Sequence, residues 1–330
     1  MNYSKTMFLA ITIMSIMIIL SSTSWLGMWM GMEMNLMSFI PLISKSKNKK
    51  SSQSMIIYFM VQSMGSIIFL FSILMNKFIV ISPIMMNLFT NELMTISMLI
   101  KLGMAPFHSW MPEMMANMNW MEILLLATIQ KLGPLFVLNS ISMSTWVMSA
   151  SAVLSAIIGS IGGIMFTSLR KILAYSSISH MSWMIMMVNI QKQWYLYLMI
   201  YSLLMLSICS WFYKNNCYFM NQMMKNSSLT EKLVISTLFL SLGGMPPLLG
   251  FLPKWIAIQT MMTNTAIMIM MIMIMTSMLT LFYYMRMISL SMLLFTTTNK
   301  WTSMSKNNLT LFMVIIVNLM MPMFLITNFI

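Results

Sequence analysis

The chain has 330 residues and a mean hydropathy of +0.86, with 59% hydrophobic and 7% charged residues. A soluble globular domain carries roughly 25% charged residues, so this composition excludes a soluble enzyme and equally a disordered chain. The net charge of +13 comes from 18 Lys and Arg against five Glu. Because these basic residues are dispersed among apolar spans, they indicate membrane topology and argue against a nucleic-acid partner.

Motifs for redox cofactors, nucleotides and metals are missing from the sequence. Cys209 and Cys217 are the two cysteines, too few for a four-thiolate iron–sulfur cluster and too far apart for a CxxC site. The sequence also lacks a G-x-G-x-x-G fingerprint, a Walker loop and a His pair suited to haem. We therefore expect this chain to hold no cofactor and no metal.

Long apolar runs follow one another along the whole chain. A membrane-spanning helix needs about 20 apolar residues. Polar breaks separate eleven runs of suitable length, which predict an all-α polytopic membrane protein with the spans 5–22, 25–43, 54–75, 83–105, 121–141, 145–166, 170–190, 193–213, 231–260, 263–293 and 308–329.

The basic residues test this count of spans. With the sides alternating at each helix, the side that carries the N-terminus holds twelve: Lys5, Lys45, Lys47, Lys49, Lys50, Arg170, Lys171, Lys214, Lys225, Lys232, Lys300 and Lys306. The opposite side holds two, Lys77 and Lys192. Such asymmetry follows the positive-inside rule, so the N-terminal side is expected to be the cytoplasm or a mitochondrial matrix.

An internal repeat appears when the sequence is shifted by 141 residues. GMAPFHSWMPE (103–113) then aligns with GMPPLLGFLPK (244–254). Each segment carries two helix-breaking prolines six residues apart: Pro106, Pro112, Pro247 and Pro253. Two ordinary proline kinks are the alternative interpretation. We predict two inverted five-helix repeats, 1–141 and 145–293, each with a broken helix, followed by a loop and C-terminal helix at 294–330.

Ionisable side chains inside the apolar spans are the candidate functional residues. Lysine at the bilayer centre costs roughly 2.5–3.5 kcal/mol, so such residues imply mutual pairing or a hydrated path. The candidate set is Glu33, Lys101, Lys131, Lys254 and His180. For His180 a purely structural role is an equal alternative. A row of these groups could pass protons along water, because a nearby carboxylate stabilises a buried ammonium and separating the pair would release a proton.

Four motifs carry a resemblance to a known family. They are LIKLGMAPFHSWMPE (99–113), IQKLGPL (129–135), TSLRKILAYSSISHMSW (167–183) and LSLGGMPPLLGFLPKW (240–255). Together they closely resemble the chain 2 family of NADH–ubiquinone oxidoreductase from animal mitochondria, which are antiporter-like membrane subunits of respiratory complex I. The resemblance runs nearly end to end. Multi-subunit cation/proton antiporters share the motifs and are the rival family.

The resemblance implies a function and roles for particular residues. Glu33 matches the family's intramembrane Glu, Lys101 its broken-helix Lys, Lys131 its central relay Lys, and Lys254 its second broken-helix Lys. Proton translocation would be driven by quinone reduction elsewhere in the complex, where NADH, FMN, iron–sulfur clusters and ubiquinone are expected. The implied neighbours are membrane lipids and other subunits, notably chains 4 and 4L, in the mitochondrial inner membrane with the N-terminus on the matrix side.

Overall fold

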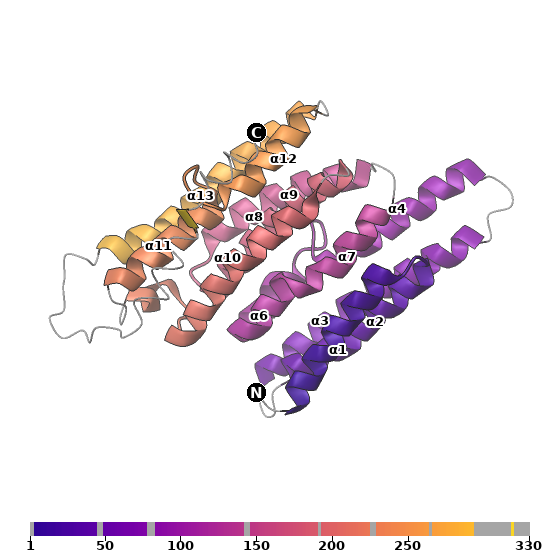
Figure 1. The fold of residues 1–330 in the computed structure, drawn as a ribbon, viewed down its shortest axis with the longest axis horizontal. Helices are drawn as coiled ribbons and strands as arrows, with labels where there is room; N and C mark the ends of the chain where they lie inside the picture. Colours follow the sequence, from indigo (N-terminus) through magenta and orange to yellow (C-terminus); the bar gives the residue numbers. More distant parts are fainter. Residues whose placement is uncertain are drawn as a thin grey trace. The chain divides into compact units, whose positions relative to one another are not determined.

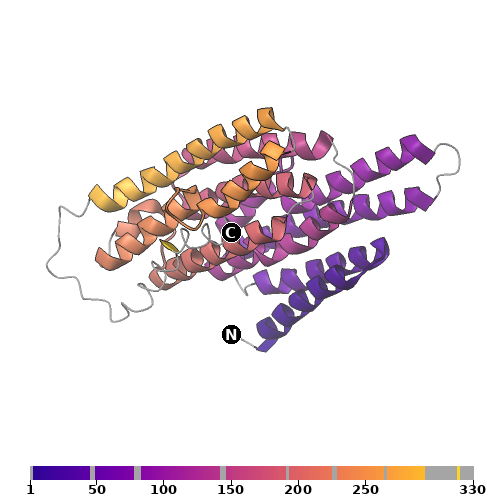
Figure 2. The same cartoon turned by 45° about the horizontal axis from the view of Figure 1, so that its top comes forward.

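The computed structural model describes residues 3–44, 49–77, 83–141, 146–190, 193–224, 229–263, 266–293 and 318–319. Almost all of these residues are helical (Figures 1 and 2), which confirms the predicted all-α membrane fold. Seven described helical segments are long and apolar enough to cross a membrane. The predicted span 308–329 lies outside the described residues except for 318–319, so the count of eleven spans stays a prediction.

The chain divides into two compact units. The first comprises Met1–Ser155 and Ile185–Lys192, and the second comprises Ala156–Met184 and Gln193–Ile330. The boundaries fall inside two helices, α8 (Trp146–Met165) and α9 (Leu169–Asn189). Compactness is a different criterion from sequence repetition, and the repeat boundaries predicted above remain a prediction.

The first unit is a bundle in which helices adjacent in sequence pack together. Its other helices are α1 (Tyr3–Ser21), α2 (Trp25–Ile43), α3 (Lys49–Lys77), α4 (Pro83–Leu102), α5 (Trp110–Asn117), α6 (Trp120–Ala127) and α7 (Ile129–Ser140). Helices α1 and α2 approach closely at Gly31, which has no side chain. A Cβ at this position would lie 2.6 Å from Ile19 Cγ1, too close to be accommodated without a shift. Ile19 also contacts Gly133, so small residues on α2 and α7 let three helices meet at one side chain.

The second unit also contains α10 (Trp194–Asn215), η1 (Met220–Met224), α11 (Leu229–Gly243), α12 (Phe251–Thr263) and α13 (Ile267–Leu293). Helix α13 packs against α11 and α12. It also holds the end of α8, because Arg286 donates from Nη1 to the Ile164 carbonyl at 2.7 Å and from Nη2 to the Phe166 carbonyl at 3.1 Å. A guanidinium at this position satisfies carbonyls that have no partner within their own helix.

Two helices are interrupted where the repeat predicts, and both interruptions begin with the same turn. Helix α4 is followed directly by Gly103, with φ +68°, and α11 is followed directly by Gly244, with φ +78°. In the turn after α4, the Gly103 N–H donates to the Ile100 carbonyl and the Met104 N–H donates to the Leu99 carbonyl. The second turn repeats both bonds 141 residues later, from Gly244 to Ser241 O and from Met245 to Leu240 O. This is the Schellman pattern, in which glycine supplies the left-handed conformation.

The prolines of the two repeats occupy equivalent places in these interruptions. Pro106 and Pro247 lie between the half-helices, where they cannot continue a helix. Pro112 and Pro253 are the third residues of α5 and α12. The N–H groups of the first helical turn have no acceptor within the helix, so a proline, which lacks this group, is tolerated there. The expected broken helices are therefore present, although the first half of span 83–105 ends at Leu102.

The predicted span 121–141 is present as Trp120–Ser140, with a local irregularity that the sequence did not predict. The segment forms α6 and α7, which meet at Thr128. The Thr128 hydroxyl donates to Leu124 O at 2.7 Å, a local bond that bends helices. Pro134, one turn into α7, lacks the N–H that would donate to Gln130 O. The break places Lys131 in the first turn of α7.

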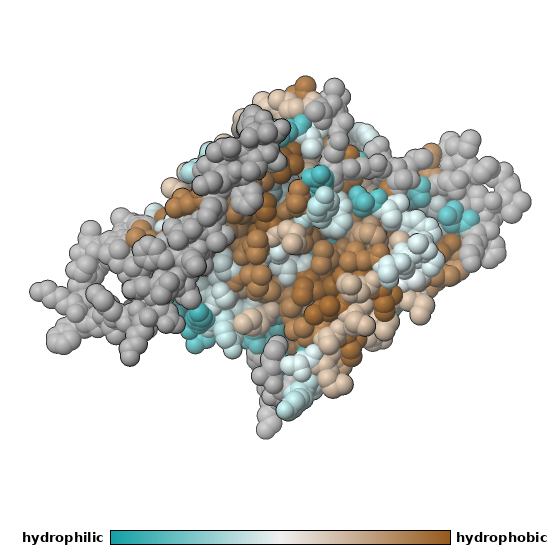
Figure 3. All heavy atoms as spheres, viewed as in Figure 1, coloured by the Kyte–Doolittle hydropathy of each residue, from teal (hydrophilic) through white to brown (hydrophobic). Residues whose placement is uncertain are grey.

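Large apolar side chains cover the surface of the described helices. They are exposed along α1 at Met7 and Met14, along α3 at Met60 and Ile67, and along α13 at Met275. Figure 3 shows this brown, hydrophobic surface on one face of the molecule. An apolar exterior of this kind suits contact with lipid tails or with other membrane subunits.

Glu122 shows how one acidic residue serves the fold. It is buried, and its two carboxylate oxygens accept bonds of 3.0 Å from the backbone N–H and the side-chain amide of Asn119, at the start of α6. We expect Glu122→Leu to destabilise the protein by about 1 kcal/mol, because a helix-start N–H loses its acceptor. The measurement is the thermal midpoint of the assembled protein. Glu122→Gln keeps an acceptor and is the matched control; equal loss in both variants would contradict this role.

Candidate functional site

Lys101 lies in the last turn of α4, directly before the first break, with 6% of its surface exposed. Its Nζ atom contacts Met32 Sδ at 3.7 Å, and Met32 is the residue directly before the half-buried Glu33 on α2. Gly65 on α3 makes room for the lysine stem, since a Cβ there would lie 2.8 Å from Lys101 Cγ. The structure therefore brings Lys101 beside the segment of α2 that carries Glu33.

Lys131 lies in the first turn of α7 with 2% of its surface exposed. The start of a helix is the end where a positive charge is least favoured. Lys131 thus has a different electrostatic setting from Lys101, whose ammonium is near the carbonyl end of its helix.

Neutral hydrogen bonds connect the segments that carry these three ionisable residues. Gln130, next to Lys131, donates from Nε2 to Asn35 Oδ1 at 2.9 Å, and Asn35 is two residues beyond Glu33. The Tyr58 hydroxyl donates to Gln130 Oε1 at 3.1 Å. One turn further along α3, Gln62 donates from Nε2 to the Lys101 backbone carbonyl at 3.0 Å. We call these four side chains, Asn35, Tyr58, Gln62 and Gln130, the amide frame.

Lys254 lies in the first turn of α12, in the second unit, and is 5% exposed. Its side chain reaches back across the break, so that Nζ donates to the Gly243 carbonyl at 2.9 Å. That carbonyl is at the C-terminal end of α11, where the helix dipole favours a cation. The Lys254 ammonium thus lies at the negative end of the α11 dipole, although the residue itself belongs to the first turn of α12, where a positive charge is disfavoured.

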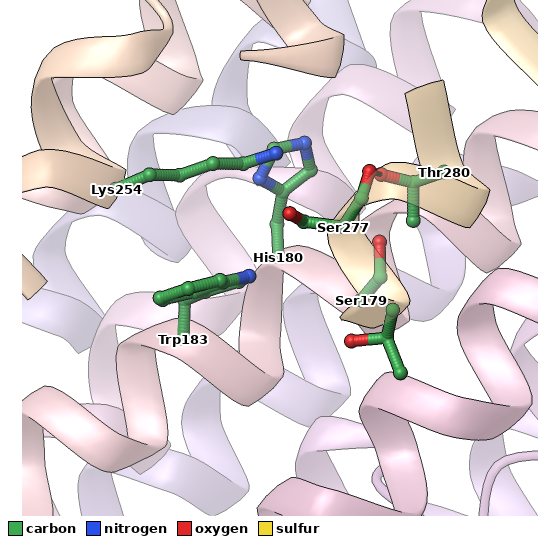
Figure 4. A pocket seen from close by; sticks show the side chains of 7 residues that line it. Ser179, His180, Trp183, Lys254, Ser277 and Thr280 are labelled. Carbon is green, nitrogen blue, oxygen red and sulfur yellow. Dashed lines mark hydrogen bonds between the residues drawn. The ribbon is translucent and has the colours of Figure 1, made fainter. Parts of the chain in front are cut away.

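Lys254 and His180 share a small cavity, which Figure 4 shows from close by. The cavity measures about 10 Å³, close to the roughly 10–15 Å³ that one water molecule needs. Its lining is mostly polar: Ser179, His180, Trp183, Lys254, Thr276, Ser277 and Thr280. In Figure 4 the Lys254 ammonium points toward the His180 ring. His180 is 7% exposed, and its Nδ1 lies 2.9 Å from the Tyr197 hydroxyl.

Both units therefore place a buried ammonium at the carbonyl end of an interrupted helix. In the first unit the lysine belongs to that helix, and in the second it comes from the helix after the break. Glu113, which aligns with Lys254 in the repeat, is exposed in the first turn of α5. The 141-residue alignment predicts the breaks correctly but does not pair the two lysines.

The sequence interpretation missed the amide frame and Tyr197. Two signals were available: amide side chains within apolar spans beside Glu33 and Lys131, and the four-residue spacing of Tyr58 and Gln62, which puts both on one helix face. Among the described residues, no group of three His, Cys or Glu side chains is placed to hold a metal ion. The site consists of ammonium, carboxylate, imidazole, amide and hydroxyl groups, a set suited to moving protons.

Comparison with known proteins agrees with this architecture. Residues 22–280 match the family model described as NADH:quinone oxidoreductase/Mrp antiporter, TM. The NADH-ubiquinone oxidoreductase chain 2 of Locusta migratoria is 40% identical over 316 residues, which cover 93% of this chain and 91% of that protein.

Solved structures share the fold at low sequence identity. A chain of respiratory complex I from Thermus thermophilus gives a TM-score of 0.82 at 18% identity, covering 88% of this chain and 71% of that chain. A chain of the Mrp complex from Dietzia sp. DQ12-45-1b gives a TM-score of 0.74 at 16% identity, covering 85% and 59%. The chain belongs to the NADH-ubiquinone oxidoreductase chain 2 family, the antiporter-like membrane-arm subunits of respiratory complex I.

Proposed function

We propose that this chain is a non-redox subunit that translocates protons across the mitochondrial inner membrane, driven by electron transfer from NADH to ubiquinone in other subunits. The observation that carries the proposal is the burial of Lys101, Lys131 and Lys254 inside apolar helices. Their ammonium groups cost several kcal/mol at membrane depth, and proton relays are one of the functions for which such groups are retained.

In the proposed path, Glu33, Lys101 and Lys131 form the proton-carrying set of the first unit, and Lys254 and His180 form that of the second. Lys101 Nζ contacts Met32, the residue before Glu33, so in this proposal the Glu33 carboxylate stabilises the charged form of Lys101 and a change in their separation would change whether Lys101 holds its proton. In the second unit a proton can leave Lys254 Nζ, cross one water molecule in the shared cavity and reach the His180 ring. Pro106, Pro112, Pro247 and Pro253 keep the helices interrupted beside these groups.

The proposed orientation puts the N-terminus and the basic loops in the matrix. In the first unit Lys5 Nζ donates to Leu42 O at 3.3 Å, so Lys5 and the end of α2 lie at one end of the bundle. In the second unit Arg170 lies 4.2 Å from the Tyr218 ring centroid, which joins the start of α9 to the segment after α10. These two contacts support the proposed orientation, in which the positive-inside rule puts the basic residues on the matrix side.

The proposal places the chain among other membrane subunits, notably chains 4 and 4L, and among lipids. FMN, iron–sulfur clusters and the binding of NADH and ubiquinone are assigned to other subunits. The alternative is a subunit of a cation/proton antiporter complex, which the broader family includes.

The test uses the whole complex in proteoliposomes. We expect NADH and ubiquinone to drive acidification of one compartment, and the triple variant Glu33→Gln, Lys131→Met, Lys254→Met to lose it while the complex still assembles. Full pumping by the assembled triple variant would refute the proposed path. Exchange of Na⁺ for protons without any electron donor would favour the antiporter alternative instead.

A further inference from the structure

Tyr197 makes a specific contact with a residue of the proposed path. Its hydroxyl lies 2.9 Å from His180 Nδ1, and both residues are buried, with 2% and 7% of their surfaces exposed. An imidazole has two ring nitrogens, and the partner of one decides which proton the other can exchange. The contact with Tyr197 therefore bears directly on the atom of His180 that serves the cavity shared with Lys254.

The Tyr197 hydroxyl is buried, and its hydrogen-bond partner in the structure is the His180 ring nitrogen. Tyr197 comes from α10 and meets the His180 ring at a centroid distance of 6.1 Å, in an edge-on arrangement. A buried hydroxyl without a partner costs about 1–3 kcal/mol, so the ring nitrogen and the hydroxyl satisfy each other. A phenylalanine would fill the same space without this bond, and packing alone does not account for a tyrosine here.

We infer that Tyr197 is a positioning residue that fixes the ring orientation and tautomer of His180, so that Nε2 exchanges protons with the cavity. Nδ1–H donates to the Tyr197 oxygen and keeps its proton throughout. A proton leaves Lys254 Nζ, passes through one water molecule and forms the N–H bond at Nε2, leaving a neutral amine and an imidazolium whose charge the Tyr197 oxygen helps to stabilise. The inference rests on the proposed function and adds a residue to it.

The experiment compares variants of the assembled complex in proteoliposomes. Tyr197→Phe removes the hydroxyl and keeps the ring. Tyr201→Phe is the matched control, because Tyr201 is equally buried, lies one turn along α10 and packs its ring 5.0 Å from that of His180. Proton pumping is measured per assembled complex. We expect about a tenfold loss for Tyr197→Phe, the scale of other residues that orient a functional group, and no change for Tyr201→Phe.

A double-mutant cycle separates positioning from a structural role. His180→Gln should lower pumping, and adding Tyr197→Phe to it should cause no further loss, because the hydroxyl acts through the imidazole. Independent, additive losses would overturn the inference, as would normal pumping by Tyr197→Phe. If Tyr197→Phe also lowers the amount of assembled complex, pumping is still compared per assembled complex in the His180→Gln background. That comparison distinguishes a positioning role of Tyr197 from a structural one.

The outcomes also distinguish this inference from the proposed function. Impaired His180→Gln with unimpaired Tyr197→Phe overturns the role of Tyr197 alone. Normal pumping by His180→Gln overturns the role of His180 and with it that of Tyr197. Lys254→Met, measured in parallel, tests the path without reference to either residue.

Discussion

Replacing Lys101 with methionine is expected to lower proton pumping by about tenfold or more while the complex still assembles. The ammonium is the proposed proton carrier, and it belongs to the last turn of α4, where a positive charge is favoured; methionine keeps only the length of the stem. Loss of a positioned acid or base typically costs about 10²–10⁴-fold, so a tenfold fall is a cautious expectation. Assembly should survive because methionine replaces a costly buried charge and the carboxylate of Glu33 that remains is only half-buried.

The measurement for Lys101→Met is NADH-driven proton uptake per assembled complex in proteoliposomes. Lys214→Met is the control, since it removes an exposed lysine from the last turn of α10. Lys101→Arg keeps a charge and should retain more activity than Lys101→Met. Equal pumping by Lys101→Met and Lys214→Met would exclude Lys101 from the path.

Replacing Gly244 with alanine is expected to damage both the fold and the function of the second unit. Gly244 has φ +78°, a conformation that costs an L-residue about 1–2 kcal/mol. An alanine Cβ there would also lie 2.9 Å from both Cδ and Nζ of Lys254, so the end of this side chain, which donates to the Gly243 carbonyl, would have to shift. We expect less assembled complex and, per assembled complex, slower proton pumping.

The adjacent glycine provides the control for Gly244→Ala. Gly243 lies within α11, and a Cβ at that position would meet its nearest neighbour, Leu281 Cγ, at an ordinary 3.5 Å. Alanine favours the helix over glycine by up to about 1 kcal/mol, so Gly243→Ala should be neutral or stabilising. Thermal stability and pumping of the two variants are compared; similar behaviour would show that the left-handed turn and the position of Lys254 are unimportant.

Sequence patterns predicted the breaks at Gly103 and Gly244 because glycine and proline have strong local effects on the backbone. They also identified Lys101, Lys131 and Lys254, because a charge within an apolar span is conspicuous. The span 121–141 was predicted, but the irregularity at Thr128 within it was not, because its cause, a threonine hydroxyl bonded to the preceding turn, is common in helices that run without a break.

Contacts between distant residues could not be predicted in this way. Gln130 and Asn35 are 95 residues apart and His180 and Tyr197 are 17 apart, on different helices. Periodicity places a side chain on a helix face but does not say which face of another helix it meets. Similarly, Lys254 reaches the carbonyl of Gly243 because the chain turns back after α11, which depends on three-dimensional geometry.

The amide frame has a consequence for how the first unit could work. Amides carry no net charge and do not titrate at physiological pH, so Asn35, Gln62 and Gln130 keep the same donors and acceptors whichever neighbouring group is protonated. The helices that carry Glu33 and Lys131 are thus joined by hydrogen bonds that do not change when these residues gain or lose a proton. Such hydrogen bonds would favour a mechanism in which protons move between side chains while the helices stay nearly in place. They would disfavour a mechanism in which whole helices shift at every turnover.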